Sequence, residues 1–197
     1  MNEIIYLREQ LNLIIGFLDV SDEAVYEAIK AHDKYELGQS IDDLYGNEYS
    51  NYQNHITTSA LILGFTHFED FLTKMVSKIL CKYPNKNRMK VTIDRFEQLG
   101  TGYSEILAVE QAKRLTFSEK VKLTKATYPT FEDELIENMQ LVNQIRNCLM
   151  HNNGYADERL TPKYLKGAKI VLSAGEIHGY GLMARRFGDM IWIKVNE

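Results

Sequence analysis

One segment in the last third of the chain carries polar side chains that can do chemistry together. It spans residues 145–154 and reads Ile-Arg-Asn-Cys-Leu-Met-His-Asn-Asn-Gly. Arg146 lies four residues after Val142 and three before Leu149, so it falls within the apolar stripe of the helix predicted here. A buried unpaired charge costs several kcal/mol, so such an arginine must be paired, reach a polar cleft or serve an interface.

The spacing of these polar residues sets which of them can act on one group. His151 follows Arg146 by five residues, which places it about 140° around an α-helix, so the two side chains do not stack directly. Asn147 and His151 are four residues apart and share a face. The long arginine side chain could swing toward that face. Two donors and an imidazole would then converge near the end of one helix.

The order Arg-Asn, three variable residues and His resembles the signature of the HEPN superfamily (higher eukaryotes and prokaryotes nucleotide-binding domains). In this chain the signature is Arg146 to His151. A second segment, residues 64–72, is similar to the long earlier helix that many members pair with the motif helix. The resemblance covers about residues 50–155. It does not include residues 156–197, and the first 40 residues match only as generic helix.

The resemblance implies a metal-independent endoribonuclease, of the toxin or phage-defence kind, that needs no cofactor. It implies a homodimer whose interface forms the Arg/His cleft. His151 would move a proton between the RNA 2′-hydroxyl or the leaving 5′-oxygen and solvent. Arg146 would hold and neutralise the scissile phosphate, and Asn147 would orient His151 or the phosphate. The product would carry a 2′,3′-cyclic phosphate, and an antitoxin or other inhibitor protein would be a further partner.

Two other interpretations stay open. Some members of the superfamily keep the fold without cleavage, so the chain could be a non-catalytic binding or regulatory module that recognises nucleotide, RNA or a partner protein. It could also be a helical bundle in which the motif arises by chance. The complete motif favours cleavage over the binding module. A motif that arises by chance would not place Arg146 and His151 at a shared surface cleft.

Four further polar residues are candidates for supporting roles. Glu69 and Asp70 could face the motif and position its arginine or histidine, although adjacent acidic residues on a long helix are usually solvated. His67 lies beside them, and Asn152 directly follows the motif. No cluster of metal ligands is visible in the sequence, so we expect no metal site.

Hydrophobic spacing predicts the elements that must hold these residues. Apolar residues recur every three or four positions over most of residues 1–155, which predicts a mainly α fold, and the resemblance implies that its helices form an antiparallel bundle. The expected elements are a helix up to a break at Ser21, a second helix to about residue 36, a loop over 38–49, a long helix over 52–83, short helices over 91–128 broken at residues 100, 102 and 118, and the motif helix, capped by Thr130 and ended by Gly154.

The character of the sequence changes after Pro162. Residues 168–172 and 190–195 favour β-strands, and the glycines between them are typical of turns. We therefore expect residues 156–197 to form a short strand-rich appendage, with a C-terminal β-hairpin packed on the same domain.

Composition restricts the class of protein further. The chain has 197 residues, of which 45% are hydrophobic and 25% charged, which is typical of one globular domain. Its longest apolar run near the middle, residues 60–65, is too short to cross a bilayer, and no signal peptide is visible. Cys81 and Cys148 are too few for a disulfide framework, and we expect both to be reduced core residues. These features predict a cytoplasmic protein with no membrane partner.

The net charge of −4 hides a strong asymmetry along the chain. Residues 1–70 carry a net charge of −10, residues 71–125 carry +7, and residues 126–197 carry −1. The acidic start and basic middle could complement each other inside one fold or across a dimer, or they could leave a positive surface. Any RNA affinity would depend on local basic patches and would therefore be sensitive to salt.

Overall fold

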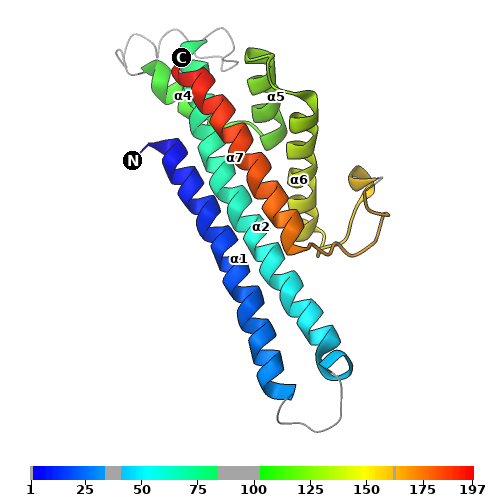
Figure 1. Cartoon of the computed structure of the whole chain (residues 1–197). Coiled ribbons are helices and arrows are strands. Elements are labelled where there is room, and N and C mark those ends of the chain that lie inside the picture. The colour runs from blue at the N-terminus through cyan, green and yellow to red at the C-terminus, as the bar shows by residue number, and fades with distance from the viewer. Residues whose placement is uncertain (1, 34–40, 84–102, 162) are drawn as a thin grey trace. The chain divides into compact units, whose positions relative to one another are not determined.

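The structure is a computed structural model that describes residues 2–33, 41–83, 103–161 and 163–197. Helices dominate these residues, which confirms the mainly α class (Figure 1). The α-helices are α1 (Glu3–Asp33), α2 (Ile41–Lys82), α4 (Tyr103–Arg114), α5 (Phe117–Thr127), α6 (Asp133–His151) and α7 (Ala174–Asn196), and a short 3₁₀ helix, η2, spans Glu158–Leu160. None of the helices in the described ranges is long and apolar enough to span a membrane.

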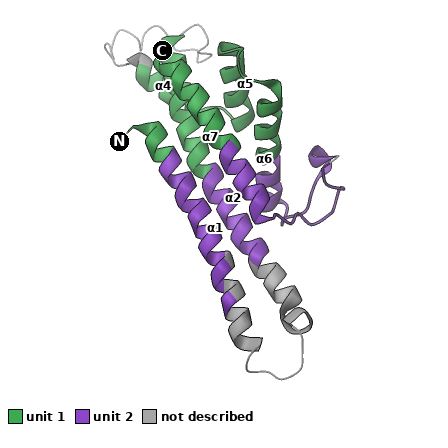
Figure 2. Cartoon of the chain, viewed as in Figure 1, with its two compact units in different colours: residues 1–7, 66–143, 183–197 green, residues 8–65, 144–182 purple. Residues whose placement is uncertain are grey.

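The chain divides into two compact units (Figure 2). Unit 1 contains Met1–Leu7, Thr66–Asn143 and Met183–Glu197, and unit 2 contains Arg8–Phe65 and Gln144–Leu182. The boundary between the units cuts four helices, so that one part of each lies in unit 1 and the other part in unit 2. These helices are α1, α2, α6 and α7. The Arg146–His151 motif belongs entirely to unit 2.

Aromatic side chains form the centre of unit 1. Phe187 of α7 lies 5.7 Å from Phe68 of α2 and 4.9 Å from Phe131, measured between ring centroids. Phe117, which opens α5, lies 6.1 Å from Phe68. All four rings are almost fully buried. Tilted and edge-on pairs at these distances add about 0.5–1.5 kcal/mol each beyond the burial of their area.

Gly188→Ala is expected to destabilise the protein by about 1 kcal/mol. A Cβ atom at Gly188 would lie 2.8 Å from Cδ2 of Leu7 and 3.5 Å from Cε1 of Phe71, both of them buried side chains. Overpacking costs about 1–3 kcal/mol, and the higher helix propensity of alanine offsets about 1 kcal/mol of that. In Gly179→Ala, the matched control in α7, no atom lies within 4 Å of the added Cβ, so a gain of up to about 1 kcal/mol is expected. Thermal unfolding measures both, and changes of the same sign would contradict this reasoning.

Unit 2 has a separate apolar core. Gly64 of α2 faces α1, since a Cβ added there would lie in ordinary van der Waals contact with Ile14, at 3.7 Å, and with Leu11, at 3.8 Å. The segment after α6 contributes as well, because Ile170 and Leu172 are fully buried although they lie outside any helix. The core side chains of unit 2 are those of Leu11, Ile14, Leu18, Leu61, Phe65, Ile145, Cys148, Leu160, Ile170, Leu172 and Ile177.

The expected C-terminal β-hairpin is wrong, because residues 190–195 lie within α7. Apolar side chains recur at helical spacing along α7, so that Phe187, Ile191 and Val195 are all buried on one face. A short apolar run fits a strand and a buried helix equally well, and tertiary packing overrides β-propensity here. Residues 168–172 contribute only an isolated antiparallel bridge, between Tyr155 and Lys169.

Other expected boundaries are also displaced. The helix α1 continues through Ser21, and residues 41–49, expected to be a loop, are helical. The break expected at Ser118 lies at Thr116, which caps α5 with a capping box to Glu119. The motif helix begins at Asp133, three residues after the expected cap. The predictions for residues 38–40 and 91–102 lie outside the described residues.

Candidate functional site

The motif lies at the C-terminal end of α6, and the local sequence stops the helix there. The backbone N–H groups of Asn152 and Gly154 both donate to the carbonyl oxygen of Cys148, at 3.0 and 3.1 Å. Asn153 has a φ of 52° and Gly154 a φ of 80°, the left-handed conformation that commonly ends helices. The predicted stop before Gly154 is therefore confirmed, with His151 as the last helical residue.

Arg146 is half-buried and is held by two neighbours in unit 2. Its guanidinium carbon lies 5.5 Å from the centroid of the Phe65 ring of α2, within the range of a cation–π contact. Its Nη1 donates to Oδ1 of Asn147 at 2.9 Å. An arginine in the apolar stripe thus packs on a buried aromatic face and donates to an amide oxygen.

Asn147 and His151 differ sharply in their environment. Asn147 is half-buried and accepts the hydrogen bond from Arg146, which orients its amide toward the guanidinium. His151 is exposed at the end of the helix. The arrangement offers a fixed cation with an amide beside it, and a solvent-accessible imidazole one turn later.

A polar cluster ties the loop that follows α6 back to the motif helix. The thiol of the buried Cys148 donates a hydrogen bond to the carboxylate of Asp157, and burial raises the pKa of this thiol. Arg159 donates through Nε to both carboxylate oxygens of Asp157, at 3.1 and 3.0 Å, and its Nη2 also bonds to Oδ2. These hydrogen bonds from Arg159 lower the pKa of Asp157 to about 2. Asp157 therefore anchors the loop as a carboxylate.

Asp157→Asn is expected to lower the free energy of unfolding by about 1 kcal/mol at pH 7, and by progressively less below pH 4. The pKa of Asp157 falls from 3.8 to about 2 on folding, so its ionised form stabilises the fold above pH 4 and this stabilisation is lost as the pH falls toward 2. The full shift corresponds to roughly 2 kcal/mol, and solvent screening reduces it to about 1 kcal/mol.

Urea unfolding of the wild type and the variant between pH 7 and pH 2.5 measures this difference. Glu158→Gln is the matched control, because Glu158 pairs with Lys166 at 3.3 Å and both side chains are largely exposed. It should change stability little at any pH. A deficit in Asp157→Asn that stays constant with pH would mean that the shape of the side chain matters, rather than its charge.

The other predicted supporting residues have partners of their own. Glu69 forms an ion pair with Lys120 at 3.4 Å, and Asp70 forms one with Lys74 at 2.7 Å. The His67 ring makes an edge-on contact with Tyr6, with centroids 6.0 Å apart. All of these lie in unit 1, whereas the motif lies in unit 2. Their participation in a site with the motif stays a prediction.

Asn152 has a structural partner in the described structure. Its Nδ2 donates to the carbonyl oxygen of Tyr155 at 2.6 Å, and the N–H of Tyr155 donates to the carbonyl oxygen of Asn152 at 2.9 Å. These two bonds close the turn that leaves α6. Asn152 therefore shapes the chain directly after His151.

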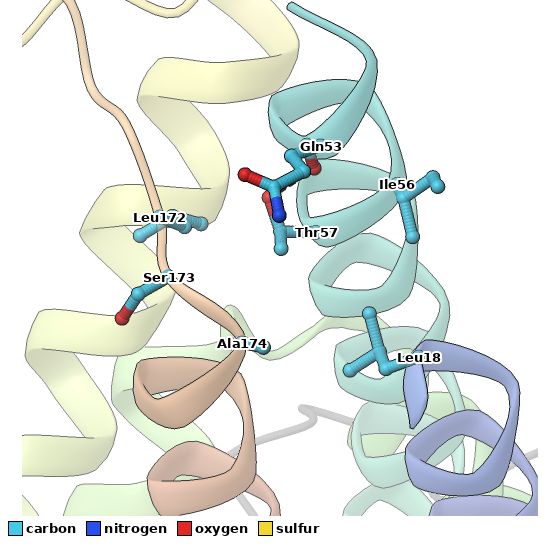
Figure 3. A pocket seen from close by; sticks show the side chains of 7 residues that line it. All are labelled: Leu18, Gln53, Ile56, Thr57, Leu172, Ser173 and Ala174. Atoms are coloured by element: carbon cyan, nitrogen blue, oxygen red, sulfur yellow. Dashed lines mark hydrogen bonds between the residues drawn. The ribbon is translucent and has the colours of Figure 1, made fainter. Parts of the chain in front are cut away.

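A cavity of about 180 Å³ lies in unit 2, and no motif residue lines it. Gln53 and Thr57 of α2 face the segment 172–174 across it (Figure 3). The Thr57 hydroxyl donates to the backbone carbonyl of Gln53, and the Ser173 hydroxyl bonds to Glu176 in the capping box of α7. Both hydroxyls are thus already engaged in hydrogen bonds within the chain.

An open cavity of about 600 Å³ in unit 1 is also lined without any motif residue. Cys81 lies on its wall and is exposed, so its expected place in the core is wrong. Partial burial, together with the nearby Glu105, raises the pKa of the Cys81 thiol, which disfavours the reactive thiolate. Lys78 also lines this cavity but pairs with Glu3 at 3.1 Å and lies 4.9 Å from the Trp192 ring.

Three participants in the motif's environment were missed by sequence reasoning. Phe65 is one of these, since nothing in the sequence pairs it with an arginine 81 residues later. Asp157 and Arg159 are two residues apart, a spacing that Asp side chains use to cap a helical turn, so this contact could have been found. The capping box of Ser173 and Glu176 was a readable signal for the start of α7.

Comparisons of the chain with protein-family models, with curated proteins and with solved structures give no match. Within the described residues, no group of three or more His, Cys, Asp or Glu side chains could hold a metal ion.

Proposed function

We propose that the protein is a metal-independent endoribonuclease of HEPN type that acts as a homodimer. One observation carries the proposal. A partly buried Arg146, braced by Phe65 and Asn147, and an exposed His151 lie on the same last two turns of α6. This pairs a fixed phosphate-binding cation with an accessible acid–base group, which is what cleavage of a phosphodiester without metal needs.

The proposed reaction uses the RNA 2′-hydroxyl as nucleophile. His151 accepts the proton of the 2′-hydroxyl as the 2′-oxygen bonds to phosphorus and the bond from phosphorus to the 5′-oxygen breaks. A proton is delivered to that 5′-oxygen, by the same imidazole or by that of the partner subunit, so the leaving group departs as a neutral hydroxyl. Arg146 neutralises the charge on the non-bridging oxygens, where its planar donors fit two of them. The upstream fragment ends in a 2′,3′-cyclic phosphate.

A homodimer could bring an arginine and a histidine to one phosphate, which a single α6 helix does not do. Arg146 and His151 are five residues apart, about 140° around α6, so one helix does not aim both at one phosphate. A twofold interface between two α6 ends would place a second motif in the same cleft, and Arg146 of one copy could then face His151 of the other. We expect such a protein to work in the cytoplasm, with an inhibitor protein if its activity is toxic.

The alternative is a non-catalytic module that binds nucleotide, RNA or a partner protein. The contacts of Arg146 favour it, since a guanidinium that packs on Phe65 and bonds to Asn147 already has a structural role. Neither of the two described cavities includes Arg146, Asn147 or His151. This alternative predicts a stable dimer that cleaves no RNA.

The test is cleavage of a defined panel of end-labelled RNAs by the wild-type protein in EDTA. Its product ends are compared before and after acid treatment, because a 2′,3′-cyclic phosphate resists phosphatase until acid opens it. Light scattering on the same sample measures the oligomeric state. Cyclic phosphate ends produced by a dimer would support the proposal. A stable protein that leaves every RNA intact, or cleavage that stops in EDTA, would overturn it.

A further inference from the structure

The turn that leaves α6 leads directly into a two-residue antiparallel contact between Tyr155 and Lys169. The N–H of Ile170 donates to the carbonyl of Gly154, and that of Ala156 donates to the carbonyl of Ala168, each at 2.8 Å. Because these bonds flank the Tyr155–Lys169 pair and do not join it, the pair is of the non-hydrogen-bonded kind. Side chains of such pairs are the closest cross-strand neighbours, with Cβ atoms about 5 Å apart.

Both members of the pair face solvent. In extended backbone successive side chains point to opposite faces, and here Ala156 and Ile170 are buried whereas Tyr155 and Lys169 are exposed. Tyr155 is 47% exposed. The backbone pairing therefore places these two side chains next to each other on one outward face.

This pair is firmly attached to the motif helix. Tyr155 follows His151 by four residues, and the backbone between them is held by the hydrogen bonds of Asn152 and by the left-handed turn at Asn153 and Gly154. The position of the ring relative to the end of α6 is thus set by local bonds within unit 2.

The other cations of this loop are engaged, which sets Lys169 apart. Arg159 bonds to Asp157, Lys166 pairs with Glu158, and Lys163 pairs with Glu176 and donates to the Tyr180 hydroxyl at 2.7 Å. Within the described part of the chain, no hydrogen bond or ion pair is found for the Lys169 side chain. Its charge is available to an external anion.

We propose that Tyr155 and Lys169 form a nucleotide subsite for single-stranded RNA, in which the ring stacks on one base and the ammonium contacts an adjoining phosphate. Stacking on exposed aromatic side chains and contact with backbone phosphates are the two terms by which single strands are bound. The subsite would hold the strand so that a neighbouring phosphodiester reaches His151. In this last respect it rests on the proposed function, whereas the binding of RNA does not.

The test uses the full chain carrying His151→Ala, so that binding is measured without cleavage, and a short unstructured RNA labelled with fluorescein. Fluorescence anisotropy in EDTA gives Kd. Tyr155→Ala is expected to raise Kd by about tenfold, and Tyr155→Phe should leave it unchanged, because stacking needs the ring and not the hydroxyl. Lys169→Gln should weaken binding several-fold and lower the slope of log Kd against log salt by about 1.

Matched controls come from the same loop. Lys166→Gln removes a lysine that is also exposed but pairs with Glu158, and Leu165→Ala truncates a side chain that is 81% exposed. Neither should change Kd by more than about twofold, a shift of a few tenths of a kcal/mol. Circular dichroism of every variant confirms that the fold is retained, as expected for substitutions of exposed side chains.

The outcomes separate the subsite from the proposed activity. RNA binding that needs Tyr155 and Lys169, in a protein that cleaves nothing, would support the subsite and overturn the ribonuclease. Cleavage in which Tyr155→Ala leaves both Kd and KM unchanged would overturn the subsite alone. Weakening in Tyr155→Phe as large as in Tyr155→Ala would overturn the stacking contact. If no RNA binds even at low salt, both are overturned.

Discussion

Replacing His151 with alanine is expected to reduce RNA cleavage by about 10²- to 10⁴-fold, the range that a positioned general acid or base contributes. His151 is exposed at the last position of α6, so its removal leaves no cavity and no buried group without a partner. The expected loss is therefore in kcat, with the thermal midpoint almost unchanged. Single-turnover cleavage of a labelled RNA in EDTA, with the melting curve of the same sample, measures both.

The matched control for this prediction is His55→Ala. His55 is also exposed, lies in unit 2 and belongs to α2 rather than to the motif. It should cleave RNA at the wild-type rate. A His151→Ala protein that retains its fold and full activity would remove His151 from the reaction and leave the ribonuclease proposal without its acid–base group.

Arg146 needs a different substitution, because it also has a structural role. Alanine would remove the contact with Phe65 along with the charge, so a loss of activity would be ambiguous. Arg146→Lys keeps the charge and much of the aliphatic stem but loses the planar fork of donors. We expect a stable protein whose cleavage rate falls at least about tenfold, since loss of one bidentate charged contact is worth more than 1.4 kcal/mol.

Glu69→Gln is expected to destabilise the protein by about 3 kcal/mol, the largest stability change among these predictions. The Lys120 side chain is 4% exposed, and its Nζ lies 3.4 Å from Oε1 of Glu69. Removing the carboxylate leaves a buried ammonium without its counter-charge, which costs about 3–5 kcal/mol, and the 30% exposure of Glu69 places the effect at the lower end. Urea unfolding at pH 7 measures the change.

Replacing the lysine of this ion pair should cost much less stability than replacing its glutamate. Lys120→Met removes the buried charge and fills similar volume, so we expect stability within about 1 kcal/mol of the wild type, and the double variant with Glu69→Gln should regain most of the lost stability. Asp70→Asn, next in the same helix, breaks a pair with Lys74 whose side chains are both at least half exposed, and should cost under about 0.5 kcal/mol. Equal costs for Asp70→Asn and Glu69→Gln would contradict this.

The same variants decide whether Glu69 has a site role. The double variant restores the fold without restoring the carboxylate. If it cleaves RNA as the wild type does, Glu69 is structural, and if it folds but cleaves poorly, the predicted supporting role is correct. Asp70→Asn gives the same comparison for the neighbouring acid.

Features that depend on neighbours within one helical turn can be predicted from the sequence alone. The three- and four-residue apolar spacing specified the mainly α class, because burying one side of a helix needs only that local period. The end of α6 was equally readable, since Asn153 and Gly154 supply the left-handed turn. The same local signals were enough to place the Arg146–His151 motif at the end of a helix.

Tertiary packing selects the period that the ambiguous segments adopt and the distant residues that come into contact. Residues 190–195 suit a strand locally, but Ile191 and Val195 gain more by burying one face of α7. The contacts of Phe65 with Arg146 and of Tyr155 with Lys169 join residues far apart in the sequence, and no local rule specifies such pairs. Packing free energy is summed over the whole fold, so these contacts follow from the complete chain and not from any segment of it.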